Sequence, residues 1–199
     1  MDTCGDCPPP GITRARAPFL YQGPVADMIR ALKFRGWGWV ARSLGGAMAH
    51  ALGSESASVA TWVPLARRRR AARGFDQAEL LARVAGRRLD LPTARLLHRA
   101  RETGSQARRA GRERRVAVHG TFRTRGPVPA SVLLVDDVLT TGATAAACAA
   151  ALRQAGARRV VLLTAARSLG TGVPGRCFGG YNRIGPSPGS VVARGEYPR

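Results

Sequence analysis

The residues best suited to chemistry lie in a single stretch, residues 132–144, where a buried strand runs into polar side chains. Residues 132–135 form an unbroken apolar run, which is typical of a strand covered on both faces of a parallel sheet. A turn then leads into an alanine-rich helix, so that the chain passes from strand to helix within a few residues. The candidate site residues in this turn are Asp136, Asp137, Thr140, Thr141, Gly142, Ala143 and Thr144.

The start of that helix predicts an anion site. Open α/β sheets bind ligands at the carboxyl ends of their strands. Backbone N–H groups at the first helical turn point outward, and the helix dipole adds partial positive charge, which suits a phosphate monoester. Thr140, Thr141 and Thr144 can donate hydroxyl hydrogen bonds to phosphate oxygens, and Gly142 lets the backbone come close.

The paired acids restrict what else the ligand carries. Asp136 and Asp137 would repel a phosphate unless sugar hydroxyls and a hydrated Mg²⁺ ion stand between them. Phosphoribosyl pyrophosphate has a 5-phosphate, two free hydroxyls and a magnesium-binding diphosphate, so it would satisfy every group. A plain strand–helix turn with Asp and Thr as caps accounts for only one or two of these residues. The chain lacks the Gly-Lys-Ser/Thr sequence of a Walker A loop.

The rest of the chain predicts an α/β fold around this turn. Apolar residues at helical spacing, Val25, Met28, Ile29 and Leu32, indicate a helix at 25–34. The strand, helix and second strand around the site form a βαβ unit, whose strands must be parallel. Further helices are predicted at about 39–52, at 77–89 and up to Gln154, and further strands at 59–65 and 160–165.

Length and composition fit one globular domain. The chain has 199 residues, of which 45% are hydrophobic, enough for one packed core with a short appendage. No apolar run reaches the roughly 18–20 residues that span a bilayer. The N-terminus lacks the pattern of a signal peptide. We therefore expect a cytoplasmic protein without membrane insertion.

The net charge of +20 comes almost entirely from arginine, since Lys33 is the only lysine. Three interpretations stay open: a solvated surface with a mutational bias toward arginine, attraction of nucleic acid, or attraction of a polyphosphate substrate. Arginines are dense at 67–70 and at 99–115, and the second segment predicts a long polar loop. Arginine without interleaved aromatic residues is a weak signal for base stacking.

Four cysteines are scattered along the chain, and only Cys4 and Cys7 have metal-ligand spacing. This pair is half of a tetrahedral zinc site, and no second CxxC completes it, so zinc binding is not expected from the pair alone. Residues 1–17 have no periodicity and are interpreted as a loop. Residues 168–199 are rich in Gly and Pro and are expected to be a poorly ordered tail.

The stretch 132–144 resembles the phosphoribosyl pyrophosphate signature of type I phosphoribosyltransferases. The wider chain resembles the ComF/GntX-type family of that superfamily, in segments 17–24, 32–36, 63–65 and 73–82. The resemblance covers about residues 4–167 and implies a type I phosphoribosyltransferase-like fold, with a central, mostly parallel sheet flanked by helices. It makes 1–17 the remnant of a zinc-ribbon segment and 18–167 the phosphoribosyltransferase-like domain.

The resemblance also implies roles for individual residues. Asp136 and Asp137 would hold the ribose hydroxyls, with Mg²⁺ nearby, and the segment from Thr140 to Thr144 would hold the 5-phosphate. The pyrophosphate loop candidates are Leu65, Ala66, Arg67 and Arg68. Arg101, Thr103 and Gln106 belong to a flexible loop that would close over the ligand and exclude water.

Two functions follow from the family. One is transfer of the phosphoribosyl group to an unknown nitrogen acceptor with release of pyrophosphate, linked to competence and DNA uptake. The alternative is a non-catalytic accessory protein of DNA uptake that senses nucleotides or binds single-stranded DNA. The expected partners are phosphoribosyl pyrophosphate, single-stranded DNA or the uptake machinery, and a second copy of the chain. A degraded relic is a third interpretation.

The sequence assigns no general base, because His50, His98 and His119 lie outside recognisable motifs. It also leaves the acceptor open. We expect that neutralising Asp136 and Asp137 together abolishes ligand binding at little cost in stability, because carboxylates at a strand end are expected to be exposed.

Overall fold

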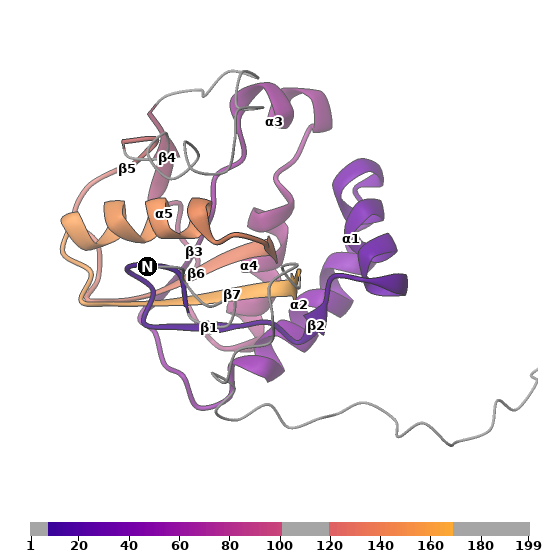
Figure 1. Cartoon of the computed structure of the whole chain (residues 1–199), viewed down its shortest axis with the longest axis horizontal. Helices are drawn as coiled ribbons and strands as arrows, with labels where there is room; N and C mark the ends of the chain where they lie inside the picture. The colour runs from indigo at the N-terminus through magenta and orange to yellow at the C-terminus, as the bar shows by residue number, and fades with distance from the viewer. Residues whose placement is uncertain (1–7, 101–119, 169–199) are drawn as a thin grey trace, which may run out of the picture.

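A parallel sheet forms the centre of the structure, a computed structural model that describes residues 8–100 and 120–168 (Figure 1). The strands lie in the order β1–β7–β6–β3, and β2 pairs with the end of β7. Every pairing in this sheet is parallel. The strands are β1 (Arg14–Arg16), β2 (Phe19–Leu20), β3 (Val59–Trp62), β6 (Ser131–Leu139) and β7 (Arg159–Arg167).

Helices cover both faces of this sheet. Helices α2 and α4 pack on one face, whereas α5 packs on the other together with a small antiparallel pair, β4 and β5. Figure 1 shows α1 beyond the arrowhead ends of β6 and β7. The predicted α/β class with a mostly parallel sheet is confirmed. The remaining elements are α1 (Gly23–Arg35), α2 (Gly38–Leu52), α3 (Arg67–Arg73), α4 (Gln77–Arg88), α5 (Ala143–Gln154), β4 (Leu97–Arg99) and β5 (Phe122–Thr124).

The predicted βαβ unit is β6–α5–β7, and its first strand is longer than expected. Strand β6 pairs with β7 from Ser131 opposite Arg159 to Leu139 opposite Arg167. The prediction that the aspartates end this strand is wrong, because β6 contains both of them and pairs with β7 beyond them, at Val138 and Leu139. Leu133 and Val135 face α2 and α4, whereas Val132 and Leu134 face α5. The two-residue period of a strand therefore decides where each aspartate points.

Part of the N-terminal segment belongs to the sheet. Strand β1, Arg14–Arg16, pairs with the middle of β7, and Ile12 and Ala17 on either side of it are buried. The loop interpretation of residues 1–17 is therefore wrong for this strand. An edge strand of arginines has no apolar alternation by which the sequence could reveal it. Residues 1–7, which include Cys4 and Cys7, lie outside the described residues.

The arginine run that follows β3 is helical. Residues Arg67–Arg73 form α3, which ends at Gly74, where the Gly74 amide donates to the Arg70 carbonyl at 2.8 Å. Arginine and alanine are good helix formers, so a short helix here is locally favourable. In the second arginine-rich segment, residues 101–115, with Arg101, Thr103 and Gln106, lie outside the described residues, as do residues 169–199.

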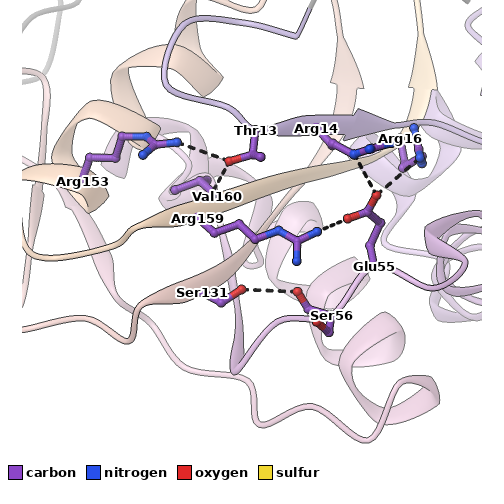
Figure 2. Close-up of polar contacts among 9 residues, drawn as sticks. All are labelled: Thr13, Arg14, Arg16, Glu55, Ser56, Ser131, Arg153, Arg159 and Val160. Carbon is purple, nitrogen blue, oxygen red and sulfur yellow. Dashed lines mark hydrogen bonds and ion pairs between the residues drawn. The ribbon is translucent and has the colours of Figure 1, made fainter. Parts of the chain in front are cut away.

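The amino ends of the strands are tied together by one acid. Figure 2 shows Glu55, which follows α2, among Arg14 and Arg16 of β1 and Arg159 of β7. Its carboxylate is 3.2 Å from Arg14 Nε and 3.5 Å from Arg16, and its side chain is only 10% exposed. Nearby, the Ser131 hydroxyl donates to the Ser56 carbonyl at 3.3 Å. Two strands and a helix end are thereby joined at this edge.

Across residues 8–100 and 120–168, no helix combines the length and the apolar character that crossing a bilayer requires.

Candidate functional site

Asp136 and Asp137 point to opposite faces of the sheet. They are consecutive residues of β6, so Asp136 lies on the α5 face and Asp137 on the face of α2 and α4. The expectation that both acids line the same helix start therefore holds for Asp136 alone. The two carboxylates occupy different environments and are described separately.

A small pocket of about 50 Å³ lies where β6 turns into α5. Gly142 is the N-cap of α5 and has a φ of 74°, a backbone conformation that favours glycine. The turn brings backbone and hydroxyl groups to the helix start, as the sequence predicted. The predicted residues that line the pocket are Asp136, Thr140, Thr141, Gly142, Ala143 and Thr144.

Among the described residues that line this pocket, the half-buried carboxyl group of Asp136 is the only titratable group. Its Oδ1 accepts a hydrogen bond from the Asp137 amide at 2.8 Å. Burial raises the pKa of Asp136 well above its ordinary value, and the negative charge of Asp137 raises it further. The hydrogen bond from the Asp137 amide and the charge of Lys33 act in the opposite direction. The pocket therefore favours either a protonated Asp136 carboxyl group or a bound partner that offsets the negative charge of the carboxylate.

Thr164 of β7 is a pocket residue that the sequence did not reveal. It lies directly opposite Asp136 in the strand pairing and lines the same pocket. Its side chain is only 1% exposed, and its hydroxyl has no hydrogen-bond partner within the described part of the chain. Buried hydroxyls are normally paired, so an unpaired one beside a pocket marks a position for a ligand or water. No motif marks Thr164, because only the register of β6 and β7 brings it to Asp136.

Asp137 is held by side chains from two helices. Lys33 Nζ of α1 lies 3.1 Å from its Oδ1, and Gln77 Nε2 of α4 donates to its Oδ2 at 2.8 Å. Asp137 is 6% exposed. The expectation of an exposed carboxylate that could be neutralised at little cost is wrong for this residue, because neutralising it would leave Lys33 without its acid and Gln77 with a weaker, neutral acceptor.

Three of the segments that resemble the family meet at Asp137. Gln77 Oε1 accepts a hydrogen bond from Arg73 at 3.0 Å. The Arg73 guanidinium in turn lies 5.1 Å from the ring centre of Phe34, the neighbour of Lys33. Residues around 33, 73 and 137 thus form one connected set of polar contacts. The sequence placed these segments in the same family pattern without predicting that they touch.

The loop after β3 is fixed by Asp76. Its Oδ2 accepts a hydrogen bond from the Leu65 amide at 2.9 Å, while its Oδ1 caps α4 at the Ala78 amide, at 3.1 Å. Burial raises the pKa of Asp76, and these hydrogen bonds act against the rise.

The pyrophosphate loop candidates lie at the same edge of the sheet as the pocket, because β3 is the parallel neighbour of β6. They are not part of the pocket lining. Leu65 and Ala66 are half-buried, and Arg67 and Arg68 are exposed.

Asp136 and Asp137 are not part of a multi-ligand metal site among the described residues. Among the described residues, no three His, Cys, Asp or Glu side chains gather closely enough to hold a metal ion. Asp136 can offer one carboxylate from the pocket, whereas Asp137 is already bound to Lys33 and Gln77. Mg²⁺ commonly binds through one or two carboxylates together with substrate phosphates and water, so a single acid is compatible with it. His50 and His98 lie away from the pocket lining.

Comparison with known proteins places the chain in a family. No family model matches the sequence. The DNA utilization protein YhgH of Escherichia coli K12 is 32% identical over 177 residues, which are 83% of this chain and 78% of that protein. The chain belongs to the ComF-type family of phosphoribosyltransferase-like proteins.

Other known proteins are also similar to this ComF-type chain. Competence protein F of Haemophilus influenzae is 29% identical over 162 residues, 74% of this chain and 70% of the relative. Competence protein ComFC of Streptococcus pneumoniae is 30% identical over 153 residues, 76% and 67% of the two chains. The allosteric regulatory enzyme of purine biosynthesis is a partial structural match, 25% identical with a TM-score of 0.44, over 63% of this chain and 25% of that one.

Proposed function

We propose that this ComF-type protein binds phosphoribosyl pyrophosphate in the pocket at the start of α5. The observation that carries the proposal is the composition of that pocket. One acid from β6, one unpaired hydroxyl from β7 and the threonine-rich turn into α5 face a common space. A phosphate monoester matches the helix start, and ribose hydroxyls match the acid and the hydroxyl.

Each part of the proposed ligand can be matched to named residues. The 5-phosphate would accept hydrogen bonds from the backbone and hydroxyls of Thr140 to Thr144. The ribose hydroxyls would donate to Asp136, which relieves the charge that burial disfavours there. The unpaired Thr164 hydroxyl adds a further group that can bond to the sugar. The diphosphate would extend toward the loop after β3, with its arginines Arg67 and Arg68.

Mg²⁺ is part of this proposal as a partner of the diphosphate. Asp136 is the carboxylate of the pocket that could share the ion, and water and phosphate oxygens would fill its other positions. The chemistry that the ion supplies when bound is neutralisation of charge on the diphosphate.

The reaction that fits the family is phosphoribosyl transfer. A nitrogen nucleophile would form a bond to the anomeric carbon while the bond from that carbon to the diphosphate oxygen breaks. Pyrophosphate then leaves with the electron pair of the broken bond. The residues of the pocket would hold the sugar and its 5-phosphate in place, so that positioning is their contribution. Asp136 is the one titratable side chain of the pocket, and it would face the hydroxyls rather than the acceptor.

Thermal unfolding with phosphoribosyl pyrophosphate and Mg²⁺ tests the binding. A ligand that binds only the folded chain stabilises it and raises the midpoint temperature of unfolding. At a ligand concentration 100 times the dissociation constant, the added stability is about 2.7 kcal/mol. We expect this shift in the natural chain, and an affinity at least about 10-fold weaker in Asp136→Asn and in Thr140→Val, since each loses a bond to a charged or polar group. Thr124→Val, outside the pocket lining, is the control. Equal shifts in all four proteins, or none in any, would contradict the proposal, and pyrophosphate release would identify turnover.

A second function, binding of single-stranded DNA, is favoured by two separate observations. Several relatives are named for competence or DNA utilization, and an exposed group of aromatic and arginine side chains lies on α1 and α2 of this chain. This surface does not share residues with the pocket at α5. The two functions can therefore be tested independently.

A further inference from the structure

An open groove of about 710 Å³ runs along the outer face of α1 and the start of α2. It is called the α1–α2 groove below. Large apolar side chains at protein surfaces are usually isolated, so a group of them along one groove marks an interaction site. The side chains that carry the argument are Asp27, Arg30, Phe34, Arg35, Trp37 and Trp39.

Three aromatic rings of this groove are exposed to solvent. Phe34 is 73% exposed, Trp39 52% and Trp37 40%. The turn at Gly36, with a φ of 65°, separates α1 from α2 and leaves both tryptophans outside the core. The two indoles stack on each other with their centres 5.8 Å apart and their planes 27° from parallel. They form a preassembled aromatic surface rather than part of a packed interior.

Arginines alternate with these rings. The Arg35 guanidinium lies 5.1 Å from the centre of the Trp37 ring, and Arg73 lies at the same distance from Phe34. No acid of the described residues pairs with Arg35. Among the described residues that line the groove, Asp27 is the one acid, and it forms an ion pair with Arg30 at 2.6 Å. The expectation that the arginines lack interleaved aromatic residues is wrong at this groove.

We infer that the α1–α2 groove binds single-stranded nucleic acid, with bases stacking on Trp37 and Trp39 and phosphates meeting Arg35. This places the second proposed function on named residues and rests on it. Exposed aromatic rings beside cations are the combination that holds single strands without reading their sequence. A second copy of the chain is disfavoured as the occupant, because each copy carries a net charge of +20. An enclosed small molecule is disfavoured because the groove is open along its length.

Binding of a fluorescent oligothymidine of about 15 nucleotides, a length within the range of single-strand site sizes, tests this assignment. We expect Trp37→Ala with Trp39→Ala to weaken binding at least about 30-fold, because two stacking rings are lost and each stacked base contributes about 1–3 kcal/mol. Trp39→Phe keeps a stacking surface and should retain most of the affinity. Arg35→Gln should lower the salt dependence of binding, because a neutralised phosphate contact is lost. Arg88→Gln removes the same charge from an exposed site on α4 and should change the affinity less than Arg35→Gln.

Tryptophan fluorescence gives an independent readout. The chain has three tryptophans, and Trp62 is buried in the core, so quenching by the oligonucleotide reports mainly on the groove. The assignment is overturned if the natural chain does not bind the oligonucleotide or if the double alanine variant binds it equally well. It is also overturned if that variant only abolishes self-association. The shift with phosphoribosyl pyrophosphate should persist in the double variant, which separates failure of the groove from failure of the pocket.

Discussion

The two ends of the central sheet hold charge in opposite ways. At the amino ends of the strands, one acid, Glu55, is shared by three arginines. At the carboxyl ends, two acids, Asp136 and Asp137, have one lysine between them, and a neighbouring hydroxyl has no partner within the described residues. The first end is satisfied by the protein itself, whereas the second leaves a buried hydroxyl without a partner among the described residues. The arginines at the amino ends therefore have a structural role, because they join strands through Glu55. The proposed phosphate site lies at the opposite, acidic end of the sheet.

The largest effect should come from Glu55→Gln. The change leaves three arginines facing one another without an acid, at a position where the Glu55 side chain is 10% exposed. Removing one partner of a buried charge group costs about 3–5 kcal/mol, and the solvent exposure of the arginines reduces this to about 2–3 kcal/mol. The free energy of unfolding in urea measures the loss. Binding of phosphoribosyl pyrophosphate to the folded protein should not change.

Asp27→Asn is the matched control for Glu55→Gln. It also removes one acid from an arginine pair, but the Asp27 side chain is 71% exposed. Surface pairs of this kind contribute about 0–1 kcal/mol. Equal losses in the two variants would mean that the amino end is no more than a solvated charge cluster, and the contrast between the two ends would disappear.

The next effect belongs to Asp137→Asn, which should lower the free energy of unfolding by about 1–2 kcal/mol. Lys33 would lose its acid at 3.1 Å, while Gln77 would keep a weaker, neutral acceptor. Urea unfolding of the natural chain, of Asp137→Asn, of Lys33→Met and of the double variant makes up a double-mutant cycle. The double variant should recover part of the loss, because no buried charge is left unpaired. If the two changes are simply additive, Lys33 and Asp137 do not form a pair in solution.

The sequence predicted the βαβ unit around the pocket because its elements are long and strongly patterned. The apolar strands and the alanine-rich helix leave few alternatives, and the segment from Thr140 to Thr144 lines the pocket as expected. The opposite orientations of Asp136 and Asp137 would have followed from the period of a strand, had the strand been continued through them. Aspartate is depleted within strands, so the sequence pattern predicted that the strand ends where the two aspartates begin.

The remaining features depend on contacts between distant segments. Thr164 becomes a pocket residue only through the register of β6 and β7, and Glu55 finds its arginines at positions 14, 16 and 159. Neither is visible in a local pattern. The aromatic residues of the α1–α2 groove, in contrast, lie within six consecutive residues, 34–39. A search for rings interleaved with arginine would have found them without the structure.

The smallest effect, and the one of opposite sign, is expected for Asp136→Asn. Burial and the charge of Asp137 raise the pKa of Asp136, so between its ordinary and its raised pKa the folded chain binds more protons than the unfolded chain. The free energy of unfolding therefore falls as pH rises through this window. Above it, the ionised carboxylate destabilises the free protein. Asp136→Asn should be slightly more stable than the natural chain at neutral pH, and this gain should vanish in acid.

Urea unfolding from about pH 4, near the ordinary pKa of an aspartate, up to about pH 8 measures this difference. Asp27→Asn is the control, and its stability should follow that of the natural chain across this range. Saturating phosphoribosyl pyrophosphate with Mg²⁺ should reverse the order of the two proteins at neutral pH, because only the natural chain gains the bonds between Asp136 and the ribose. A gain in stability that persists in acid would mean that the asparagine acts through packing. If Asp136→Asn remains more stable than the natural chain with the ligand bound, the sugar does not bind at Asp136. The contrast between the two ends of the sheet would then need another explanation.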